Sequence, residues 1–291
     1  MFHVEQFDKV MSEQKNIPTK VKDYLVTGET FELIYDSEKE MLLTNPKPST
    51  ENLSKYYESE DYISHTDSKK GIVSFLYQTV KKRALQKKVA LINSLNKGSG
   101  SLLDIGAGTG DFLKQAKKFN WKISGVEPNI GAKKLAQEKG INLEESLAEF
   151  RKKTFDVITM WHVLEHVPNL EETISTLEDL VKPGGTLIIA VPNYKSFDAK
   201  HYKSHWAAYD VPRHLWHFSQ ISMQKLFSKT FQLIKTKPMI FDSFYVSLLS
   251  EKNKTGKQNL IKAFFVGLQS NVSARKTKEY SSLIYCFKKV K

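Results

Sequence analysis

A short apolar strand followed at once by three closely spaced glycines is the feature that most constrains the fold. It runs Leu102-Leu103-Asp104-Ile105-Gly106-Ala107-Gly108-Thr109-Gly110, and a helical segment from Asp111 to Phe119 follows. Glycine permits positive φ angles and lets a ligand approach the backbone closely. In open α/β sheets, ligands bind at the carboxyl ends of the strands. The sequence therefore predicts a nucleotide-like ligand beside this loop.

The spacing of the glycines narrows the class of ligand. A dinucleotide site has the pattern G-x-G-x-x-G, whereas here the third glycine comes one residue early and Asp111 follows it. Its carboxylate stands at the helix start, where a pyrophosphate would otherwise bind. Glu127 ends the next predicted strand and is placed to accept hydrogen bonds from two ribose hydroxyls. These residues favour a ribose-bearing ligand without phosphate, and they leave an NAD-dependent dehydrogenase as a remote alternative.

Strands and helices alternate over the middle of the chain. The predicted strands are 102–105, 121–126, 155–161 and 186–191, and the predicted helices between them are 111–119, 132–139 and 170–181, the last capped by Asn169. This alternation predicts a mainly parallel sheet with helices on both faces. A helix near 222–229, a strand near 231–235, helices at 241–249 and 260–268, and a final strand at 281–290 complete the pattern.

The first part of the chain has a different character. Residues 1–97 contain no strand–glycine–helix signal, only an alternating strand at Thr30–Tyr35 and a helix at Phe75–Leu95, and Lys97-Gly98-Ser99-Gly100 then forms a hinge. We therefore expect an N-terminal β/α extension over 1–97, able to cover a substrate, and a ligand-binding domain over 98–291 with a loop-like lid insertion at 192–219.

Composition limits the class of protein. The chain has 291 residues and one cysteine, which excludes an internal disulfide and a cysteine-cluster zinc site. The N-terminus has no signal-peptide pattern, and no apolar run approaches the roughly 18 residues of a membrane span. We expect a cytoplasmic protein.

The net charge of +12 comes from scattered basic pairs such as Lys81-Lys82-Arg83 and Lys87-Lys88. We interpret these as solvated helix faces, with an acidic substrate second and nucleic acid third.

Four motifs in order give the chain a specific resemblance. They are Asp104–Gly110, Val126-Glu127-Pro128, the segment Phe155–Val167, and Lys182-Pro183-Gly184-Gly185-Thr186-Leu187. Together they resemble class I S-adenosylmethionine-dependent methyltransferases, and the match is close over residues 100–195. Leu164-Glu165-His166-Val167-Pro168 and Pro212–Ser219 look most like the branch that includes the ubiquinone-biosynthesis O-methyltransferases.

The resemblance implies a fold and a cofactor site. The implied fold is a Rossmann-like, doubly wound sheet of seven strands, with an antiparallel last strand at Ser281–Val290. The implied cofactor is S-adenosyl-L-methionine. We expect its site to contain two strand ends, the glycines and the segment beside the adenine: Asp104, Gly106, Gly108, Gly110, Glu127, Ser146, Leu147, Trp161 and His162. Trp161 is able to face a cation, although packing beneath the sheet is the favoured role.

The segment His162-Val163-Leu164-Glu165-His166 raises the question of a metal. Alone it matches the H-x-x-E-H zinc-peptidase pattern, but that motif belongs inside a helix and here it follows a buried strand, so we reject a peptidase. Relatives of the ubiquinone type hold a divalent cation with Glu-x-x-Glu-His at this place. His162 stands at the first position here. Metal ligation by His166 and a structural or substrate-facing role both remain open.

The lid at 192–219 contains four histidines, and histidine is the natural general base near neutral pH. We expect His214 to be the base, with His166 as the second choice, while packing roles remain the alternative for each of the lid's His201, His205, His214 and His217. Tyr56, Tyr57, Tyr62 and His65 are candidates for the N-terminal wall of the pocket.

We therefore expect a methyltransferase (EC 2.1.1.-) acting on a small molecule, at oxygen. The alternatives are an RNA or protein methyltransferase, for which the charge but no motif speaks, and a cofactor-binding protein without catalysis. The oligomeric state is left open.

Overall fold

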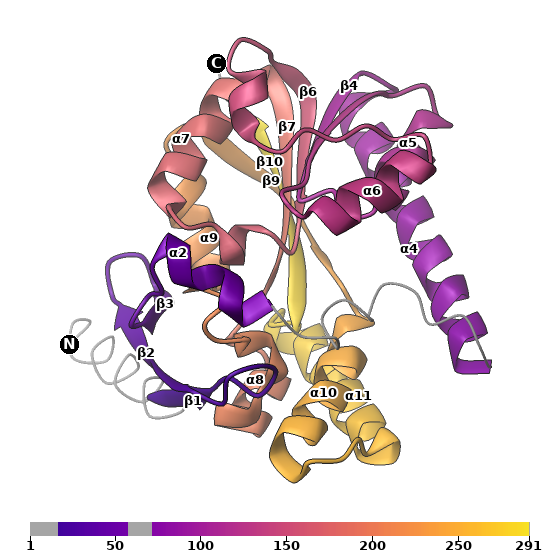
Figure 1. Ribbon diagram of the computed structural model, residues 1–291. Helices are drawn as coiled ribbons and strands as arrows, with labels where there is room; N and C mark the ends of the chain where they lie inside the picture. Colours follow the sequence, from indigo (N-terminus) through magenta and orange to yellow (C-terminus); the bar gives the residue numbers. More distant parts are fainter. Residues whose placement is uncertain (1–16, 58–71, 291) are drawn as a thin grey trace.

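A six-stranded sheet forms the centre of the computed structural model, which describes residues 17–57 and 72–290 (Figure 1). The strand order is β5-β4-β6-β7-β10-β9. β5, β4, β6 and β7 pair in parallel, and β10 is antiparallel to both of its neighbours. The strands are β4 (Ser101–Ile105), β5 (Lys122–Val126), β6 (Phe155–Trp161), β7 (Val181–Pro192), β9 (Phe231–Pro238) and β10 (Ser282–Lys289). The predicted βα alternation and the antiparallel last strand are confirmed.

The predicted seventh strand is absent from the described sheet, so the strand count was wrong. At the outer edge of β5, the described residues form a single β-bridge, between Val126 and Glu144. Apart from half-buried Leu143, the residues of 142–146 are exposed. An edge strand needs an apolar face to bury, and this segment offers a single side chain for it.

Helices cover both faces of the sheet because each has one apolar side. One core contains side chains of α7 (Leu170–Leu180) and α9 (Gln220–Phe227), and the other contains side chains of α4 (Ile72–Asn96), α5 (Asp111–Lys117) and α6 (Ile130–Glu138). The predicted Asn169 cap of α7 accepts a hydrogen bond from the Glu172 amide. In α4, Val89 and Ile92 are buried as predicted; the side chains of Phe75 and Val80 lie outside the described ones.

A small antiparallel sheet lies beyond the carboxyl ends of the parallel strands. Its order is β1-β2-β3-β8, built from β1 (Lys20–Lys22), β2 (Thr30–Asp36), β3 (Met41–Asn45) and β8 (Trp216–His217). The N-terminal region and the segment predicted as a lid thus share one sheet. We call this sheet, together with five short helical segments, the cover. The segments are α2 (Thr50–Leu53), η1 (Ser54–Tyr57), α8 (Phe197–Tyr202), η4 (Lys203–His205) and η5 (Ala207–Tyr209).

One buried arginine ties the two parts of the cover together. The Arg213 side chain is 1% exposed, and its guanidinium donates to Asp23 at 2.9 Å, to Asp210 at 2.6 Å and to the Tyr56 carbonyl at 2.9 Å. Burial opposes the charge, but the two carboxylates raise the pKa of Arg213 above its ordinary value. The cation therefore fixes residues of the N-terminal region against the segment before β8.

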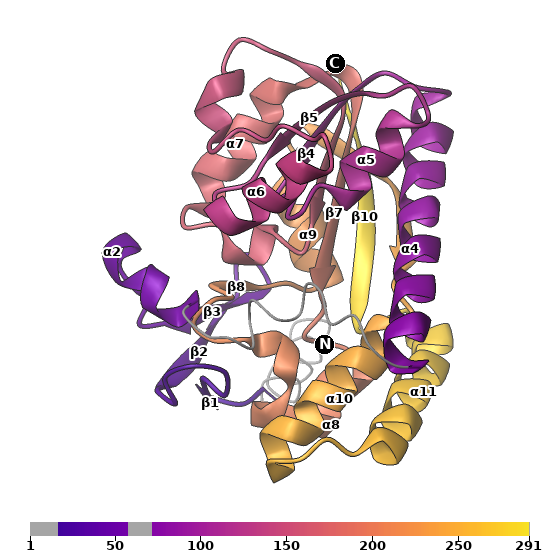
Figure 2. The ribbon, with the colours of Figure 1, turned by 45° about the vertical axis from the view of Figure 1, so that its right-hand side comes forward.

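A helical hairpin connects β9 to β10. It consists of α10 (Asp242–Thr255) and α11 (Leu260–Thr277), which lie beside α8 at the lower end of the molecule (Figure 2). Within the described residues, no helix is long and apolar enough to cross a membrane.

Candidate active site

The glycine loop has the open backbone that a close ligand requires. Gly106 has a φ of +70°, and a Cβ there would come within 2.4 Å of the Val163 side chain, so the loop after β6 packs directly on it. Gly108 has a φ of +53°, and a Cβ there would have no neighbour within 4 Å. The first glycine is thus required by packing and the second faces open space. Gly110, with a φ of +72°, caps α5.

Glu127 lies against this loop. Its Oε2 accepts a hydrogen bond from the Gly108 amide at 2.8 Å, and its Oε1 accepts one from the Asn129 amide at 2.9 Å. Each carboxylate oxygen has a second lone pair that can accept from a hydroxyl. The carboxylate is therefore fixed beside the open side of Gly108, as the ribose prediction requires.

Asp111 is neutralised from two sides. Lys81 on α4 and Lys139 after α6 each bring their amine to 2.7 Å from its carboxylate. Burial alone would raise the pKa of Asp111, but these two amines hold it below its usual range. The start of α5 thus carries a built-in anion with its own counter-ions, which leaves no charge there for a pyrophosphate.

A buried amine and a buried carboxyl lie near the end of β4. Asp104 accepts a 2.6 Å hydrogen bond from the Thr159 hydroxyl, and burial raises its pKa to about 7. The Lys88 amine of α4 lies 4.2 Å from the centroid of the Trp161 ring, and burial lowers its pKa to about 8. The indole Nε1 of Trp161 is buried and has no acceptor among the described residues. The Lys88 amine and the Trp161 indole N–H thus remain available to a ligand.

Lys81 and Lys88 correct one prediction. Both belong to basic runs that we interpreted as solvated helix faces, and that interpretation is wrong for these two side chains. Their neighbours Lys82, Arg83 and Lys87 are exposed as expected. Lys81, Leu85, Lys88 and Ile92 follow a spacing of four, three and four, which places them on the inner face of α4. That spacing is the signal by which Lys88 could have been found.

His162 directly follows β6 in a left-handed conformation, with a φ of 58°. Its Nδ1 is 3.3 Å from Glu165 Oε1 and its Nε2 is 3.2 Å from Asp242 Oδ2. Burial alone would lower the pKa of His162, but these two carboxylates raise it to about 10. His162 is therefore a cation at neutral pH that joins the loop after β6 to the start of α10. The sequence did not single out Asp242, because the two segments are 80 positions apart.

Ser146 and Leu147 follow Glu144, the residue that contacts Glu127. The Glu127 amide donates to the Glu144 carbonyl at 2.9 Å, so the segment that follows Glu144 continues along the same edge. Ser146 is exposed and accepts a hydrogen bond from the Ala148 amide, which begins η2 (Leu147–Phe150), and Leu147 is half-buried against the core. This placement agrees with an adenine beside them, which stays a prediction.

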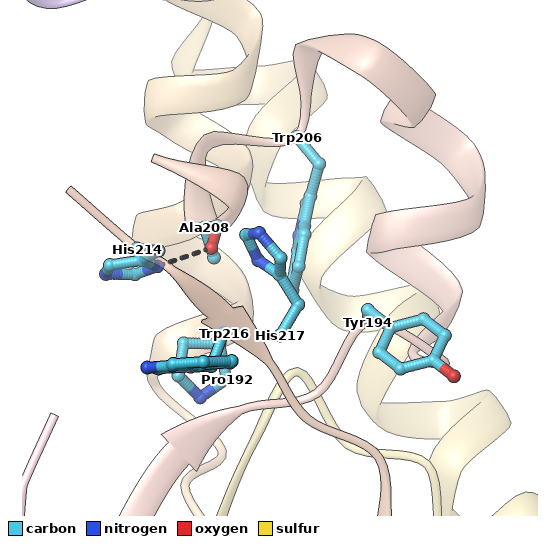
Figure 3. A pocket seen from close by; sticks show the side chains of 7 residues that line it. All are labelled: Pro192, Tyr194, Trp206, Ala208, His214, Trp216 and His217. Atoms are coloured by element: carbon cyan, nitrogen blue, oxygen red, sulfur yellow. Dashed lines mark hydrogen bonds between the residues drawn. The ribbon is translucent and has the colours of Figure 1, made fainter. Parts of the chain in front are cut away.

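The two predicted base candidates meet. The Leu215 amide donates to the Glu165 carbonyl at 2.8 Å, which brings His214 beside His166 of η3 (Leu164–His166), and the centroids of their rings are 4.5 Å apart. His214 Nδ1 lies 2.8 Å from the Ala208 carbonyl (Figure 3). A carbonyl only accepts, so Nδ1 carries the proton, and Nε2 carries a lone pair in the neutral form of the ring. His214 therefore has the tautomer that a base needs.

His166 is held differently. Its Nδ1 donates to the Arg213 carbonyl at 3.1 Å and is 3.3 Å from the Tyr57 hydroxyl. Burial and the neighbouring His214 lower the pKa of His166 to about 4, so this ring is neutral at physiological pH. Tyr57 thus contacts His166 from the N-terminal side, and its role in a pocket wall stays a prediction. Tyr56 is buried, and Tyr62 and His65 lie outside the described residues.

Glu165, His166 and His214 could together hold a metal ion, since one ligand atom of each lies within 4.8 Å of the others. Glu165 Oε2 is buried and has no hydrogen-bond partner among the described residues, so its lone pairs are available to a cation. Two imidazoles and one carboxylate suit a transition ion such as zinc, iron or manganese better than magnesium. The Glu-x-x-Glu-His set of the relatives is not reproduced, because His162 is a paired cation.

The other lid histidines have packing or surface positions. His217 is buried against Thr44, 3.0 Å from its hydroxyl, and burial lowers its pKa to about 3. The space beside His214, lined by Pro192, Tyr194, Trp206, Ala208, His214, Trp216 and His217, is too narrow to hold a cofactor (Figure 3). His201 and His205 are not buried.

Comparison with known proteins gives the family. A model described as a methyltransferase domain matches residues 77–233, more than half of the chain. A ubiquinone biosynthesis O-methyltransferase of Nitrosococcus oceani is 31% identical over 32% of this chain and 43% of the relative. An uncharacterized protein of Methanocaldococcus jannaschii is 36% identical over 39% of this chain and 54% of the relative. The matched part thus spans about half of each of these relatives.

Solved structures agree on the fold. The plantazolicin methyltransferase BpumL, solved with S-adenosylhomocysteine, superposes with a TM-score of 0.50 over 82% of this chain and 94% of its own, at 14% identity. A candidate sarcosine dimethylglycine methyltransferase of Galdieria sulphuraria superposes with a TM-score of 0.50 over 73% of this chain and 86% of its own, also at 14% identity. Together with the matching domain model, these findings show that the chain belongs to the class I S-adenosylmethionine-dependent methyltransferases.

Proposed function

We propose that the protein transfers the methyl group of S-adenosylmethionine to the oxygen of a small-molecule acceptor. The observation that carries the cofactor half is the fixed carboxylate of Glu127 beside the open face of Gly108. A carboxylate in that position accepts two ribose hydroxyls and repels a phosphate. Asp104, Gly106, Gly110, Ser146, Leu147, Trp161 and His162 are the other proposed cofactor residues.

We assign Lys88 to the methionyl carboxylate. Its amine is the group in this corner that can pair with an anion, and the ion pairs of the described residues leave it out. The buried indole N–H of Trp161 is the second available donor. A carboxylate bound there would satisfy both groups, and it would hold the sulfonium near the ends of β4 and β6.

The chemistry proposed for the acceptor side needs a base and a fixed geometry. Methyl transfer is an in-line displacement, and alignment of nucleophile, methyl carbon and sulfur can supply roughly 7–11 kcal/mol. His214 Nε2 takes the hydroxyl proton as the oxygen attacks, and the Nδ1–H bond to Ala208 fixes the ring during this step. His166 is the second candidate, but its low pKa makes it the weaker base.

The test is equilibrium binding followed by a transfer assay. We expect S-adenosylmethionine to bind, NAD not to bind, and Glu127→Ala to lose about ten- to a hundredfold in affinity, since a hydrogen bond to a charged group contributes about 1.5–3 kcal/mol. Glu145→Ala, an exposed carboxylate on the neighbouring segment, is the matched control and should bind normally. No binding, or equal binding by both variants, rejects the proposal.

The acceptor is then found by supplying labelled S-adenosylmethionine and a panel of hydroxylated metabolites. Label in a metabolite supports the proposed substrate class. Salt-sensitive label in RNA, or label in protein, supports the alternative that the charge of +12 permits. Cofactor binding without any transfer supports the inactive binding protein.

A further inference from the structure

The outer side of α11 carries an exposed row of apolar side chains, here called the apolar stripe. It consists of Leu260, Ile261, Phe264, Phe265, Leu268 and Val272, whose exposed fractions run from 42% at Leu268 to 73% at Ile261. Residues at these spacings fall on one side of a helix. Phe264 also stacks on Phe244 of α10, with ring centroids 5.5 Å apart. Soluble monomers rarely leave such a continuous apolar surface open to water.

The inner side of α11 is apolar as well. Ala263, Val266, Gly267 and Ala274 are buried against the rest of the protein. Two sides of α11 are thus apolar, and an apolar side of a helix is normally covered. Packing within the described structure covers only half of α11, so the apolar stripe needs a second partner.

The charge of the hairpin identifies the chemistry of that partner. Lys257 lies just before the apolar stripe, and Arg275 and Lys276 lie in the last turn of α11. All three side chains are exposed. The hairpin Asp242–Thr277 contains two carboxylates, and both are engaged: Glu251 is 1% exposed, and Asp242 contacts His162. The surface of the hairpin therefore presents apolar side chains and cations without an exposed carboxylate.

This charge pattern argues against a second copy of the chain. If two α11 helices packed stripe to stripe in an antiparallel arrangement, Lys257 of one copy would lie near Arg275 and Lys276 of the other. In a parallel arrangement, each of these cations would lie near the same residue of the other copy. No exposed carboxylate of the hairpin could compensate either contact. An apolar face with a cationic border is the pattern of a helix that lies in the interface of an anionic membrane.

We propose that the α10–α11 hairpin docks the protein onto an anionic lipid surface, with the apolar stripe inserted at the level of the headgroups and Lys257, Arg275 and Lys276 against the lipid phosphates. The docked element starts at the active site, because Asp242, the first residue of α10, contacts His162 at 3.2 Å. The membrane-facing helix and the methyl-transfer site thus belong to one connected unit.

Vesicle flotation of the full chain tests this proposal. We expect binding to vesicles of phosphatidylcholine with about 30% phosphatidylserine, weaker binding to phosphatidylcholine alone, and a loss as salt is raised from about 0.1 to about 0.5 M. Ile261→Ser/Phe264→Ser/Phe265→Ser should reduce the partition coefficient roughly tenfold or more, because the apolar contact is removed. Ile130→Ser on α6, where the side chain is 68% exposed, is the matched control and should bind like the parent chain.

Two further variants keep the result independent of folding. Lys257→Glu/Lys276→Glu leaves the apolar stripe intact and should lose the preference for phosphatidylserine. Phe264→Trp should retain binding, and brominated lipid should quench the added fluorescence. The proposal is overturned if the parent chain does not float with either type of vesicle, or if the serine variant floats as well as its control. A dimer in sedimentation that the serine variant dissociates would assign the stripe to a second copy instead.

Discussion

In the proposed cofactor site, Lys88 is the residue whose charge we expect to affect binding most. Replacing it with methionine keeps the packing on Trp161 and removes the cation, so we expect the affinity for S-adenosylmethionine to fall about tenfold or more. Decarboxylated S-adenosylmethionine should bind the parent chain and Lys88→Met equally, because it lacks the group that the amine binds. Titration calorimetry of both ligands measures this. A loss that is equal for the two ligands contradicts the assignment.

The same residue gives the binding reaction a pH dependence. Lys88 is charged below its folded-state pKa of about 8, which burial has lowered from 10.5, and it becomes neutral as the pH rises through that value. The parent chain should therefore lose affinity for S-adenosylmethionine above about pH 8, while Lys88→Met should show no such step. A step that persists in the variant would have to come from another group.

In the proposed mechanism, His214 is the residue on which the acceptor chemistry depends. His214→Asn should leave cofactor affinity unchanged and lower kcat by about 10²–10⁴-fold, the usual contribution of a general base. His201→Asn in the same segment is the control, since His201 stacks on Phe197 away from the His166–His214 pair. Steady-state kinetics with the acceptor from the screen measures both. A His214 variant with normal kcat transfers the role to His166 or to alignment alone.

Single positions also show where sequence reasoning stops. The proposed roles of Gly106, Gly108 and Glu127 follow from local spacing, because a strand, a tight turn and a helix are adjacent in the chain. The inward positions of Lys81 and Lys88 and the Asp242–His162 contact depend on packing between segments that are far apart in sequence. A lysine-rich helix looks solvated until the surface it covers is known.

Among the elements, the cover depends most on Arg213. Arg213→Met removes the cation and leaves Asp23 and Asp210 without their partner, so we expect a loss of about 3–5 kcal/mol in the free energy of unfolding. Lys39→Met, which breaks the exposed pair with Glu171, should cost at most about 1 kcal/mol. Urea denaturation followed by circular dichroism compares the two. Similar losses would show that the Arg213 network does not hold the cover.

Element prediction succeeded where an element is defined by its own residues. The main-sheet strands β4, β5, β6 and β10 and the helices between them have apolar patterns of the right period, and Asn169 caps α7 as expected. Element prediction failed where a strand exists only through its pairing with a neighbouring strand. The seventh strand reduces to the single Val126–Glu144 bridge, and β8 exists because β3 offers Leu42 and Leu43 as partners. A two-residue strand has no pattern of its own to detect.

For the molecule as a whole, cofactor binding and stability are linked. A ligand at about 100 times its Kd stabilises the folded state by about 2.7 kcal/mol, which in a chain of this size corresponds to a rise in Tm of roughly 4 °C. We expect S-adenosylhomocysteine to produce this shift in a thermal melt, and NAD at the same concentration to produce none. A shift with NAD alone would return the dehydrogenase hypothesis to first place.

The pairing of β3 with β8 has a consequence for the order in which the protein forms on the ribosome. Leu43 and Trp216 pair across 173 positions of sequence, and contacts of such long range form late because a large loop must first be closed. During synthesis, β3 waits without its partner until residue 216 has emerged, whereas the glycine loop and Glu127 are complete about 90 residues earlier, by the ordinary N-to-C direction of folding. If the proposed sites are correct, the nascent chain thus acquires the parts of its methyl-donor site well before it can assemble its acceptor site.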